Sequence, residues 1–125
     1  MGTQNTIDTD RINTVVVAGE VTSEPVVREL ASGATVVQFD LNTPIDGSNV
    51  SVPVAWHDPT VAQQTAIARG VHLVVVGSVR RRFFRVGGRT QSRTEVIAAT
   101  VIPARRTKSV RSALTAVSDA LLAQR

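Results

Sequence analysis

The chain has no cysteine and only two histidines, His57 and His72. Without thiols it has no disulfide, no thiol nucleophile and no cysteine ligand for zinc, so we expect neither a metal nor a cofactor. It also lacks the run of roughly 18 apolar residues that a membrane-spanning helix needs, and we expect no membrane association. Residues 1–14 are polar and contain no apolar signal core, so we expect a cytoplasmic protein.

Residue patterns typical of catalysis are missing as well. We find no serine nucleophile elbow, no phosphate-binding glycine loop and no pair of carboxylates at a useful spacing. His57 stands beside Asp58, but Asp58 followed by Pro59 is better explained as the start of a helix. Because no site geometry of this kind is present, we expect a binding protein and not an enzyme.

Aromatic side chains are scarce, and the charges are unevenly distributed. Tyrosine is absent, and three phenylalanines and one tryptophan make up 3% of the residues. Residues 1–58 hold eight acids and two arginines, a net of −6, whereas residues 59–125 hold twelve bases and two acids, a net of +10. Such a division points to a partner with an acidic surface, usually a nucleic acid, although a basic surface that only aids solubility gives the same composition.

The basic half is organised around an arginine-rich stretch, Ser78–Thr94, which contains six arginines and no acid. The six are Arg80, Arg81, Arg82, Arg85, Arg89 and Arg93. Phe83 and Phe84 lie among them, and Gly87 and Gly88 predict a turn between two strands. A two-stranded ribbon with cations and aromatic faces suits a flexible polyanion that carries bases, although a solvated hairpin has the same pattern.

Strand patterns account for most of the remaining chain. Alternation or short β-branched runs predict strands at residues 13–20, 26–30, 35–41, 50–56, 71–82 and 94–101. Gly19 indicates a bulge or a bend within the first strand. Residues 42–48 are rich in turn-forming types, and we expect a loop there.

Two helices are predicted. Asp58 as the N-cap and Pro59 as the first residue predict a helix that runs to Arg69 and stops at Gly70. The second helix spans residues 108–124, because apolar residues recur there at helical spacing. These residues are Val110, Leu114, Val117 and Leu121. An isolated helix of this length is marginal in water, so it packs either on its own barrel or against a second subunit.

The order of elements predicts an all-β fold with one or two helices. A small closed barrel removes the exposed edges of such a set of strands. The five-stranded oligonucleotide-binding barrel (OB-fold) has this order, with its helix between strands 3 and 4 and an extended hairpin between strands 4 and 5. We expect a disordered leader at residues 1–11, the barrel domain at 12–103, and a basic linker with an amphipathic helix at 104–125.

Four segments, in this order, resemble the bacterial single-stranded DNA-binding protein family. They are NTVVVAGEVTSEPVVRELASGATVVQFDL from residue 13, VPVAWHD from residue 52, AIARGVHLVVVGSVRRRFF from residue 66 and RTEVIAATVIP from residue 93. The resemblance covers residues 12–103 and rests on the ordered combination of segments, since no single one of them is specific.

The resemblance implies sequence-tolerant binding of single-stranded DNA in replication, repair or recombination. It also implies a homo-oligomer, either a homotetramer or a dimer, that is associated with the nucleoid. Trp56 and Phe84 fall where the family carries aromatic residues that stack on bases. Alternation along the strand adds that Arg80, Arg82 and Phe84 share one face. We therefore expect DNA to be bound by Trp56, Arg80, Arg82, Phe84, Arg85, Arg89 and Arg93.

Several points stay open at the level of sequence. Phe83 and Phe84 differ in parity, and we expect Phe84 to face outward and Phe83 to face the protein or a neighbouring subunit. Trp56 is either a stacking residue or a partly buried core residue. Arg28 is either a groove residue or the partner of a nearby glutamate. Because aromatics are few and the family's acidic tail tip is missing, the alternative function is a protein-interaction or assembly subunit, primosome-like, with weak nucleic-acid binding.

Overall fold

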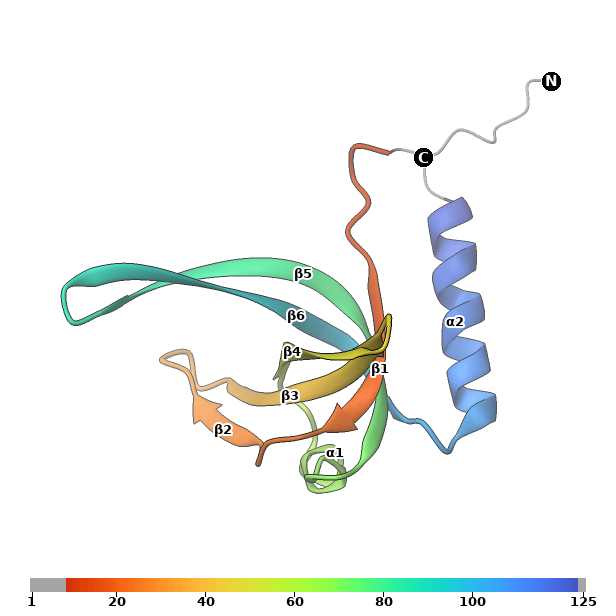
Figure 1. The fold of residues 1–125 in the computed structure, drawn as a ribbon, viewed down its shortest axis with the longest axis horizontal. Helices are drawn as coiled ribbons and strands as arrows, with labels where there is room; N and C mark the ends of the chain where they lie inside the picture. The colour runs from red at the N-terminus through yellow and green to blue at the C-terminus, as the bar shows by residue number, and fades with distance from the viewer. Residues whose placement is uncertain (1–8, 124–125) are drawn as a thin grey trace.

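Residues 9–123 of the chain are described by a computed structural model, in which six strands and two helices follow one another (Figure 1). The strands are β1 (Val15–Val21), β2 (Val26–Glu29), β3 (Thr35–Ile45), β4 (Ser48–His57), β5 (His72–Val86) and β6 (Arg89–Pro103). The helices are α1 (Val61–Ala66) and α2 (Thr107–Leu122). Most of the expected leader and the last residue of the second expected helix lie outside the described residues.

Five of these strands close into a barrel. Antiparallel ladders join β1 to β5, β5 to β6, β4 to β3, and β3 back to β1, while a short parallel ladder joins β4 to β6. β2 begins after a short segment without strand structure that follows β1. It pairs with β3 but is not one of the five strands that close the barrel. With β2 set apart, α1 lies between the third and fourth strands of the barrel, and β5 and β6 form its last hairpin. The predicted OB-fold barrel is confirmed.

Two glycines allow the strands to approach one another where the barrel bends. A Cβ atom on Gly19 would meet the carbonyl oxygen of Asn42, at the place where β1 passes from β5 to β3. A Cβ atom on Gly77 would meet the carbonyl oxygen of Ile97, beside a register shift in the ladder between β5 and β6. Any larger residue at either position would push two strands apart.

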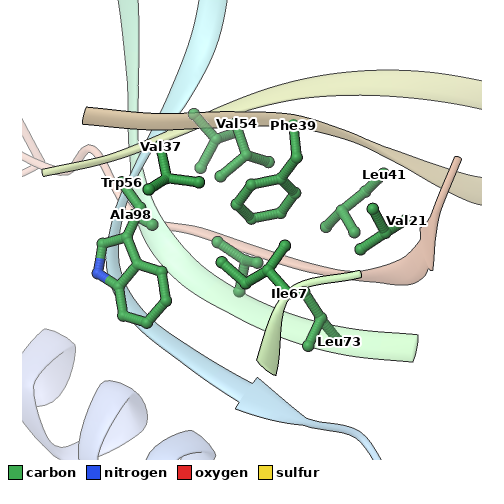
Figure 2. Close-up of a cluster of buried hydrophobic side chains, with 11 residues drawn as sticks. Val21, Val37, Phe39, Leu41, Val54, Trp56, Ile67, Leu73 and Ala98 are labelled. Atoms are coloured by element: carbon green, nitrogen blue, oxygen red, sulfur yellow. The ribbon is translucent and has the colours of Figure 1, made fainter. Parts of the chain in front are cut away.

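Apolar side chains from all five barrel strands fill the interior (Figure 2). The buried cluster consists of Val21, Val37, Phe39, Leu41, Val54, Trp56, Ile67, Leu73, Val75, Val96 and Ala98. On β3, Val37, Phe39 and Leu41 alternate with more polar residues, so one face of the strand lines the core. Ile67, from the segment that follows α1, completes the same cluster.

The loop predicted at residues 42–48 is in fact a tight hairpin. β3 continues to Ile45 and β4 begins at Ser48, so the turn consists of Asp46 and Gly47. Both residues have positive φ, 49° and 80°, as a two-residue type I′ turn requires. Asp-Gly is one of the pairs that favour this turn, and the sequence interpretation gave it too little weight.

The start predicted for the first helix is wrong. Thr60 is the N-cap: its hydroxyl accepts a hydrogen bond from the N–H of Gln63, and the side chain of Gln63 accepts one from the N–H of Thr60. Asp58 has a φ of 51°, and its carboxylate accepts a hydrogen bond from the N–H of Thr35 at 2.8 Å. Asp58 thus links the end of β4 to the start of β3, and α1 ends at Ala66, before the predicted stop.

β5 and β6 continue beyond the barrel as a two-stranded arm, longer than the sequence predicts. We use "the arm" for residues 79–96. The ladder continues until Val86 pairs with Arg89. Gly87 and Gly88, with φ of 58° and 79°, form the turn at its tip. In Figure 1 the arm projects from one side of the barrel, and α2 stands on the opposite side.

Candidate nucleic-acid interface

The arm has two faces, because residues paired across an antiparallel ladder point to the same side and successive residues point to opposite sides. What we call the even face carries Arg80, Arg82 and Phe84 of β5 and Arg93 of β6. What we call the odd face carries Arg81, Phe83 and Arg85. The strand register therefore confirms the shared face that alternation predicted.

Each face combines an arginine with a phenylalanine. The guanidinium carbon of Arg81 lies 5.4 Å from the ring centroid of Phe83, and that of Arg82 lies 5.1 Å from the ring centroid of Phe84. Both distances suit a cation–π contact, which fixes the direction of the long arginine side chains. Each pair sets a positive charge next to a ring, which is the combination that stacks a base and holds its phosphate.

The exposure of the two rings is the reverse of the expectation. Phe83 is 65% exposed, whereas Phe84 is partly buried. The reason lies in the register, since Phe84 faces the side of the hairpin on which the acidic and basic side chains at the base of the arm gather. An apolar ring that is two-thirds exposed on a basic strand is uncommon in a protein that has no partner for it.

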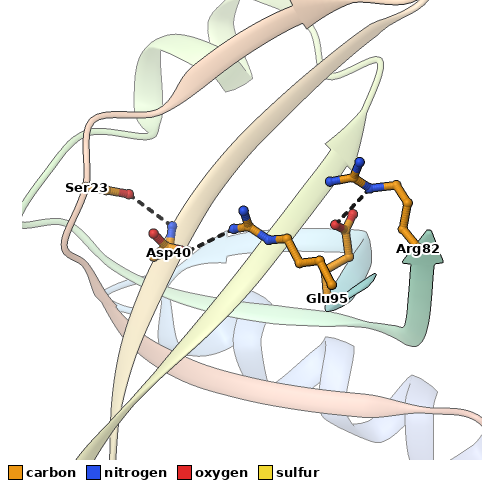
Figure 3. Close-up of polar contacts among 5 residues, drawn as sticks. Ser23, Asp40, Arg82 and Glu95 are labelled. Carbon is orange, nitrogen blue, oxygen red and sulfur yellow. Dashed lines mark hydrogen bonds and ion pairs between the residues drawn. The ribbon is translucent and has the colours of Figure 1, made fainter. Parts of the chain in front are cut away.

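Arg82 is anchored by a buried carboxylate (Figure 3). Its Nε donates a hydrogen bond to Oε1 of Glu95, on β6, at 3.3 Å. The side chain of Glu95 is 5% exposed and that of Arg82 is 38% exposed. A carboxylate at this depth requires a paired charge, so Glu95 holds Arg82 at the base of the even face while the Arg82 side chain stays partly exposed.

A second ion pair ties the arm to the barrel. An Nη atom of Arg93 lies 3.5 Å from Oδ1 of Asp40 on β3, and both side chains are partly exposed. The backbone N–H of Asp40 donates to the hydroxyl of Ser23 at 3.2 Å (Figure 3). An exposed pair of this kind contributes only about 0–1 kcal/mol, so Arg93 can exchange its carboxylate for a phosphate at little cost.

The arginines of the odd face are held by neutral groups. The guanidinium of Arg81 donates to the hydroxyl of Ser92 at 2.9 and 3.1 Å. The guanidinium of Arg85 donates to the carbonyl of Gly88 at 2.7 Å. Neither of these bonds neutralises the arginine, so the odd face keeps its positive charge.

A groove of about 330 Å³ lies where the base of the arm meets the outer surface of the barrel. Its basic lining consists of Arg28, Arg80 and Arg82. Its apolar lining includes Val36, Ala55 and Ile97, from β3, β4 and β6. His57 and Glu95 also border it. The groove therefore combines apolar surface with three cations, and it places Arg28, whose role the sequence left open, beside the arm.

Trp56 does not belong to this surface. It is 8% exposed and lies in the core cluster with Phe39 and Ile67 (Figure 2). A ring with so little exposed surface offers almost no area on which a base could stack. Of the two sequence interpretations of Trp56, the structure favours the core residue, and we leave it out of the interface.

The remaining predicted residues divide between the two faces. Arg80, Arg82, Phe84 and Arg93 gather at the even face, Arg89 lies on that face directly after the turn, where it is exposed, and Arg85 lies on the odd face. Sequence reasoning missed His57 as a groove residue and gave too little weight to Arg81 and Phe83. Arg81 and Phe83 are two residues apart, as Arg82 and Phe84 are, so alternation along the strand predicts a shared face for each pair. The sequence therefore contained the information that points to Arg81 and Phe83.

No cluster of three or more His, Cys, Asp or Glu side chains that could hold a metal ion occurs in residues 9–123. Over the same residues, neither helix is long and apolar enough to cross a membrane.

A closed five-stranded barrel with a basic, aromatic-bearing arm beside a basic groove defines an OB-fold protein suited to unpaired strands. The model of the single-strand binding protein family matches residues 12–103. The chain therefore belongs to this family, and single-stranded DNA binding is the activity that membership gives it.

Comparison with solved structures supports the fold independently. A chain from Plasmodium falciparum, described as an SSB complex with ssDNA, superposes with a TM-score of 0.64 at 19% sequence identity. The match covers 78% of the present chain and 98% of that chain. No curated protein matches the sequence significantly.

Proposed function

We propose that single-stranded DNA runs over the arm and into the groove at its base, so that bases stack on Phe83 and Phe84 while arginines pair with the phosphates. The observation that carries the proposal is the pair of Arg–Phe contacts, one on each face of an arm that has no acid outside its buried base. Members of this family bind DNA without changing it chemically, and we propose the same for this chain.

Stacking supplies the part of the affinity that does not depend on sequence. A base on an aromatic ring contributes roughly 1–3 kcal/mol, and every base offers a flat face. Phe83 is open for such a contact as it stands, whereas Phe84 is partly covered. Because the two rings lie on opposite faces, a strand that bends over the arm can use both of them.

Phosphate pairing supplies the part of the affinity that depends on salt. Arg28, Arg80 and Arg82 line one groove, so a strand that leaves the even face enters a second basic surface. Each neutralised phosphate releases counterions, and for single strands the slope of log K against log salt falls by about 0.7 per phosphate. With two available rings and many arginines, we expect binding in which the salt-dependent part is unusually large.

The wider role follows from the activity. We propose that the chain protects unpaired DNA during replication, repair or recombination, in the cytoplasm at the nucleoid, and that it works as a homo-oligomer. An oligomer lets one strand contact several arms, which raises affinity through effective concentration without a new kind of contact.

A titration of end-labelled oligothymidine, followed by fluorescence anisotropy at several salt concentrations, tests the proposal. We expect tight binding at low salt, a linear fall of log K with log salt, and weaker binding of a duplex of equal length. Binding that ignores salt, or that prefers the duplex, would contradict it. Matched DNA and RNA strands in competition show whether the strand type is also discriminated.

A further inference from the structure

The carboxylate of Glu95 has one oxygen without a hydrogen-bond partner, although the side chain is only 5% exposed. Arg82 donates from its Nε to Oε1 at 3.3 Å (Figure 3). Among residues 9–123, no hydrogen bond is donated to the other oxygen, Oε2. Buried polar atoms almost always have a partner, and a buried acceptor without one lowers stability. Oε2 is therefore an atom that an N–H group of a ligand can satisfy.

Glu95 forms part of the wall of the groove at the base of the arm. In the ladder between β5 and β6 it lies opposite Arg80, and Arg82 is the next residue of β5 on the same face. The lining also includes apolar side chains of the barrel, namely Val36, Ala55 and Ile97. At about 330 Å³ the groove is at the small end of ligand sites, which span roughly 300–1,000 Å³. It suits one flat ring with a polar edge, such as a nucleobase.

The charged residues of the groove have a fixed hydrogen-bonding character. The carboxylate of Glu95 only accepts, and the guanidinium of Arg82 only donates. Each carboxylate oxygen has two lone pairs, so Oε1 can accept a second hydrogen bond beside the one from Arg82. Gln38 and His57, which also line the groove, can both donate and accept and therefore select no base by themselves. The groove thus presents a donor next to two acceptors.

We infer that the groove receives a guanine base of the bound strand and reads its Watson–Crick edge. Guanine carries the acceptor O6 beside two adjacent donors, N1–H and the N2 amino group, and this order complements one donor of Arg82 followed by the two oxygens of Glu95. Such a base lies with its faces against the apolar lining, as unstacked bases do in pockets that read them. The remaining donors of Arg82, with Arg28 and Arg80, are left for the flanking phosphates.

The other three bases fit this edge less well. Adenine, cytosine and thymine each present a single donor group on the Watson–Crick edge, with an acceptor next to it. One oxygen of Glu95 would then face that acceptor or remain without a partner, and both arrangements are unfavourable. A guanine site rests on the proposed path of DNA over the arm, and it adds one selected base to a surface that is otherwise tolerant of sequence.

Competition between strands that differ in one base tests the guanine site. Labelled oligothymidine bound to the protein is displaced by unlabelled oligothymidine with one central guanine, and the release is followed by anisotropy. We expect the guanine strand to compete about fivefold better than the all-thymine strand, the lower end for a specific bidentate contact. Equal competition by the two strands, when oligothymidine itself binds in a salt-dependent way, would overturn the guanine site and leave the DNA path standing. No binding of either strand would instead remove the DNA path.

Two modified bases show which edge is read. Hypoxanthine lacks the N2 amino group and should lose most of the advantage of guanine. 7-Deazaguanine keeps the Watson–Crick edge and should retain the full advantage. The opposite order, in which hypoxanthine matches guanine and 7-deazaguanine does not, would contradict reading by Glu95. Because the protein is unchanged in this comparison, the result does not depend on the folding of a variant.

A variant at Glu95 links the preference to its carboxylate. In Glu95→Gln the amide oxygen can still accept from Arg82, and the amide nitrogen then places a donor where guanine also has donors. We expect the guanine strand to lose its advantage over the all-thymine strand, whereas the control Asp46→Asn, at the β3–β4 turn, should keep it. An undiminished advantage in Glu95→Gln would overturn the role of Glu95.

The base is proposed to enter as part of a strand, because the arginines of the arm lead the phosphates on either side of it to the groove. Guanosine monophosphate has neither the neighbouring phosphates nor the bases that stack on the arm. At the concentration at which the guanine strand competes, it should therefore displace no oligothymidine. Equally effective displacement by guanosine monophosphate would show that the free nucleotide is the ligand and would contradict the choice of a strand.

Discussion

The Nε of Arg82 lies 3.3 Å from Oε1 of Glu95. This contact joins a partly exposed arginine on β5 to a carboxylate on β6 that is only 5% exposed. The pair sits at the base of the arm and at the edge of the basic groove. It therefore has two effects at once. Glu95 orients Arg82, and it also cancels part of the positive charge that a phosphate would meet.

Replacing Glu95 separates these two effects. Glu95→Gln keeps an oxygen that accepts from Arg82 but removes the negative charge from the groove. We expect oligothymidine to bind roughly 1.4- to fivefold more tightly at low salt, because one solvent-screened charge contributes about 0.2–1 kcal/mol. Asp46→Asn, which removes one negative charge at the β3–β4 turn, is the control and should change the affinity less. Weaker binding by Glu95→Gln would show that the net positive charge around Arg82 does not limit the affinity for DNA.

Removing either ring of the arm should weaken binding without unfolding the protein. Phe83→Ala and Phe84→Ala should each cost about 1–3 kcal/mol of binding free energy, measured by anisotropy at fixed salt. Val86→Ala is the matched control, because Val86 is also apolar and exposed on the arm but offers no ring. Equal affinities for wild type and both phenylalanine variants would exclude base stacking on the arm.

Charge removal on the arm should act on the salt dependence. Arg82→Gln should reduce the slope of log K against log salt by about 0.7, because one phosphate contact is lost. Arg69→Gln, in the connection between α1 and β5, removes an exposed arginine outside the arm and should leave the slope unchanged. The two slopes, determined over the same salt range, decide the point. Identical slopes for the two variants would count against phosphate contact at Arg82.

Emission from Trp56 should respond little to DNA. Trp56 is the only tryptophan, tyrosine is absent, and the ring is 8% exposed in the core. We expect the blue-shifted emission of a buried indole and only slight quenching at saturating oligothymidine. Strong quenching that tracks binding would return Trp56 to the interface and contradict its place in the core.

Gly77 should be the least replaceable position of the barrel wall. In Gly77→Ala, the added methyl group would meet the backbone of Ile97 on β6. Because backbone cannot rotate away as a side chain can, we expect a loss of roughly 1–3 kcal/mol in the free energy of unfolding by urea. Gly87→Asn is the control, since asparagine tolerates the positive φ at the open tip. Equal stabilities of the two variants would argue against close packing at Gly77.

The fold could be predicted from the sequence because local patterns and the overall architecture agree. On β3, Val37, Phe39 and Leu41 alternate as a half-buried strand must, and Gly19 falls where β1 changes partners. Predicted boundaries failed where two local signals competed. Asp58 is a residue type that often caps helices, but its carboxylate accepts a hydrogen bond from the N–H of Thr35 on β3. No local sequence pattern predicts this contact, because the two residues are far apart in the chain.

The candidate site could be predicted only in part. The high density of arginines can be read directly from residues 78–94. So can the spacing of two residues that places an arginine and a phenylalanine on the same face of the strand. The burial of Trp56 could not be read, because β4 alternation is compatible with either face until the pairing with β3 and β6 is known. The role of Arg28 stayed open for the same reason, since only the ladder between β2 and β3 brings it to the arm.

Photocross-linking tests the central claim most directly. Oligothymidine is irradiated in complex with the wild-type protein, and the attachment sites are mapped by mass spectrometry after cleavage beside acidic residues. Such cleavage leaves residues 59–95 together in one fragment that ends at Glu95, because no acid lies between Asp58 and Glu95. We predict that the cross-links fall in this fragment, at Phe83 and Phe84. Cross-links confined to other parts of the chain, with none on the arm, would contradict the account.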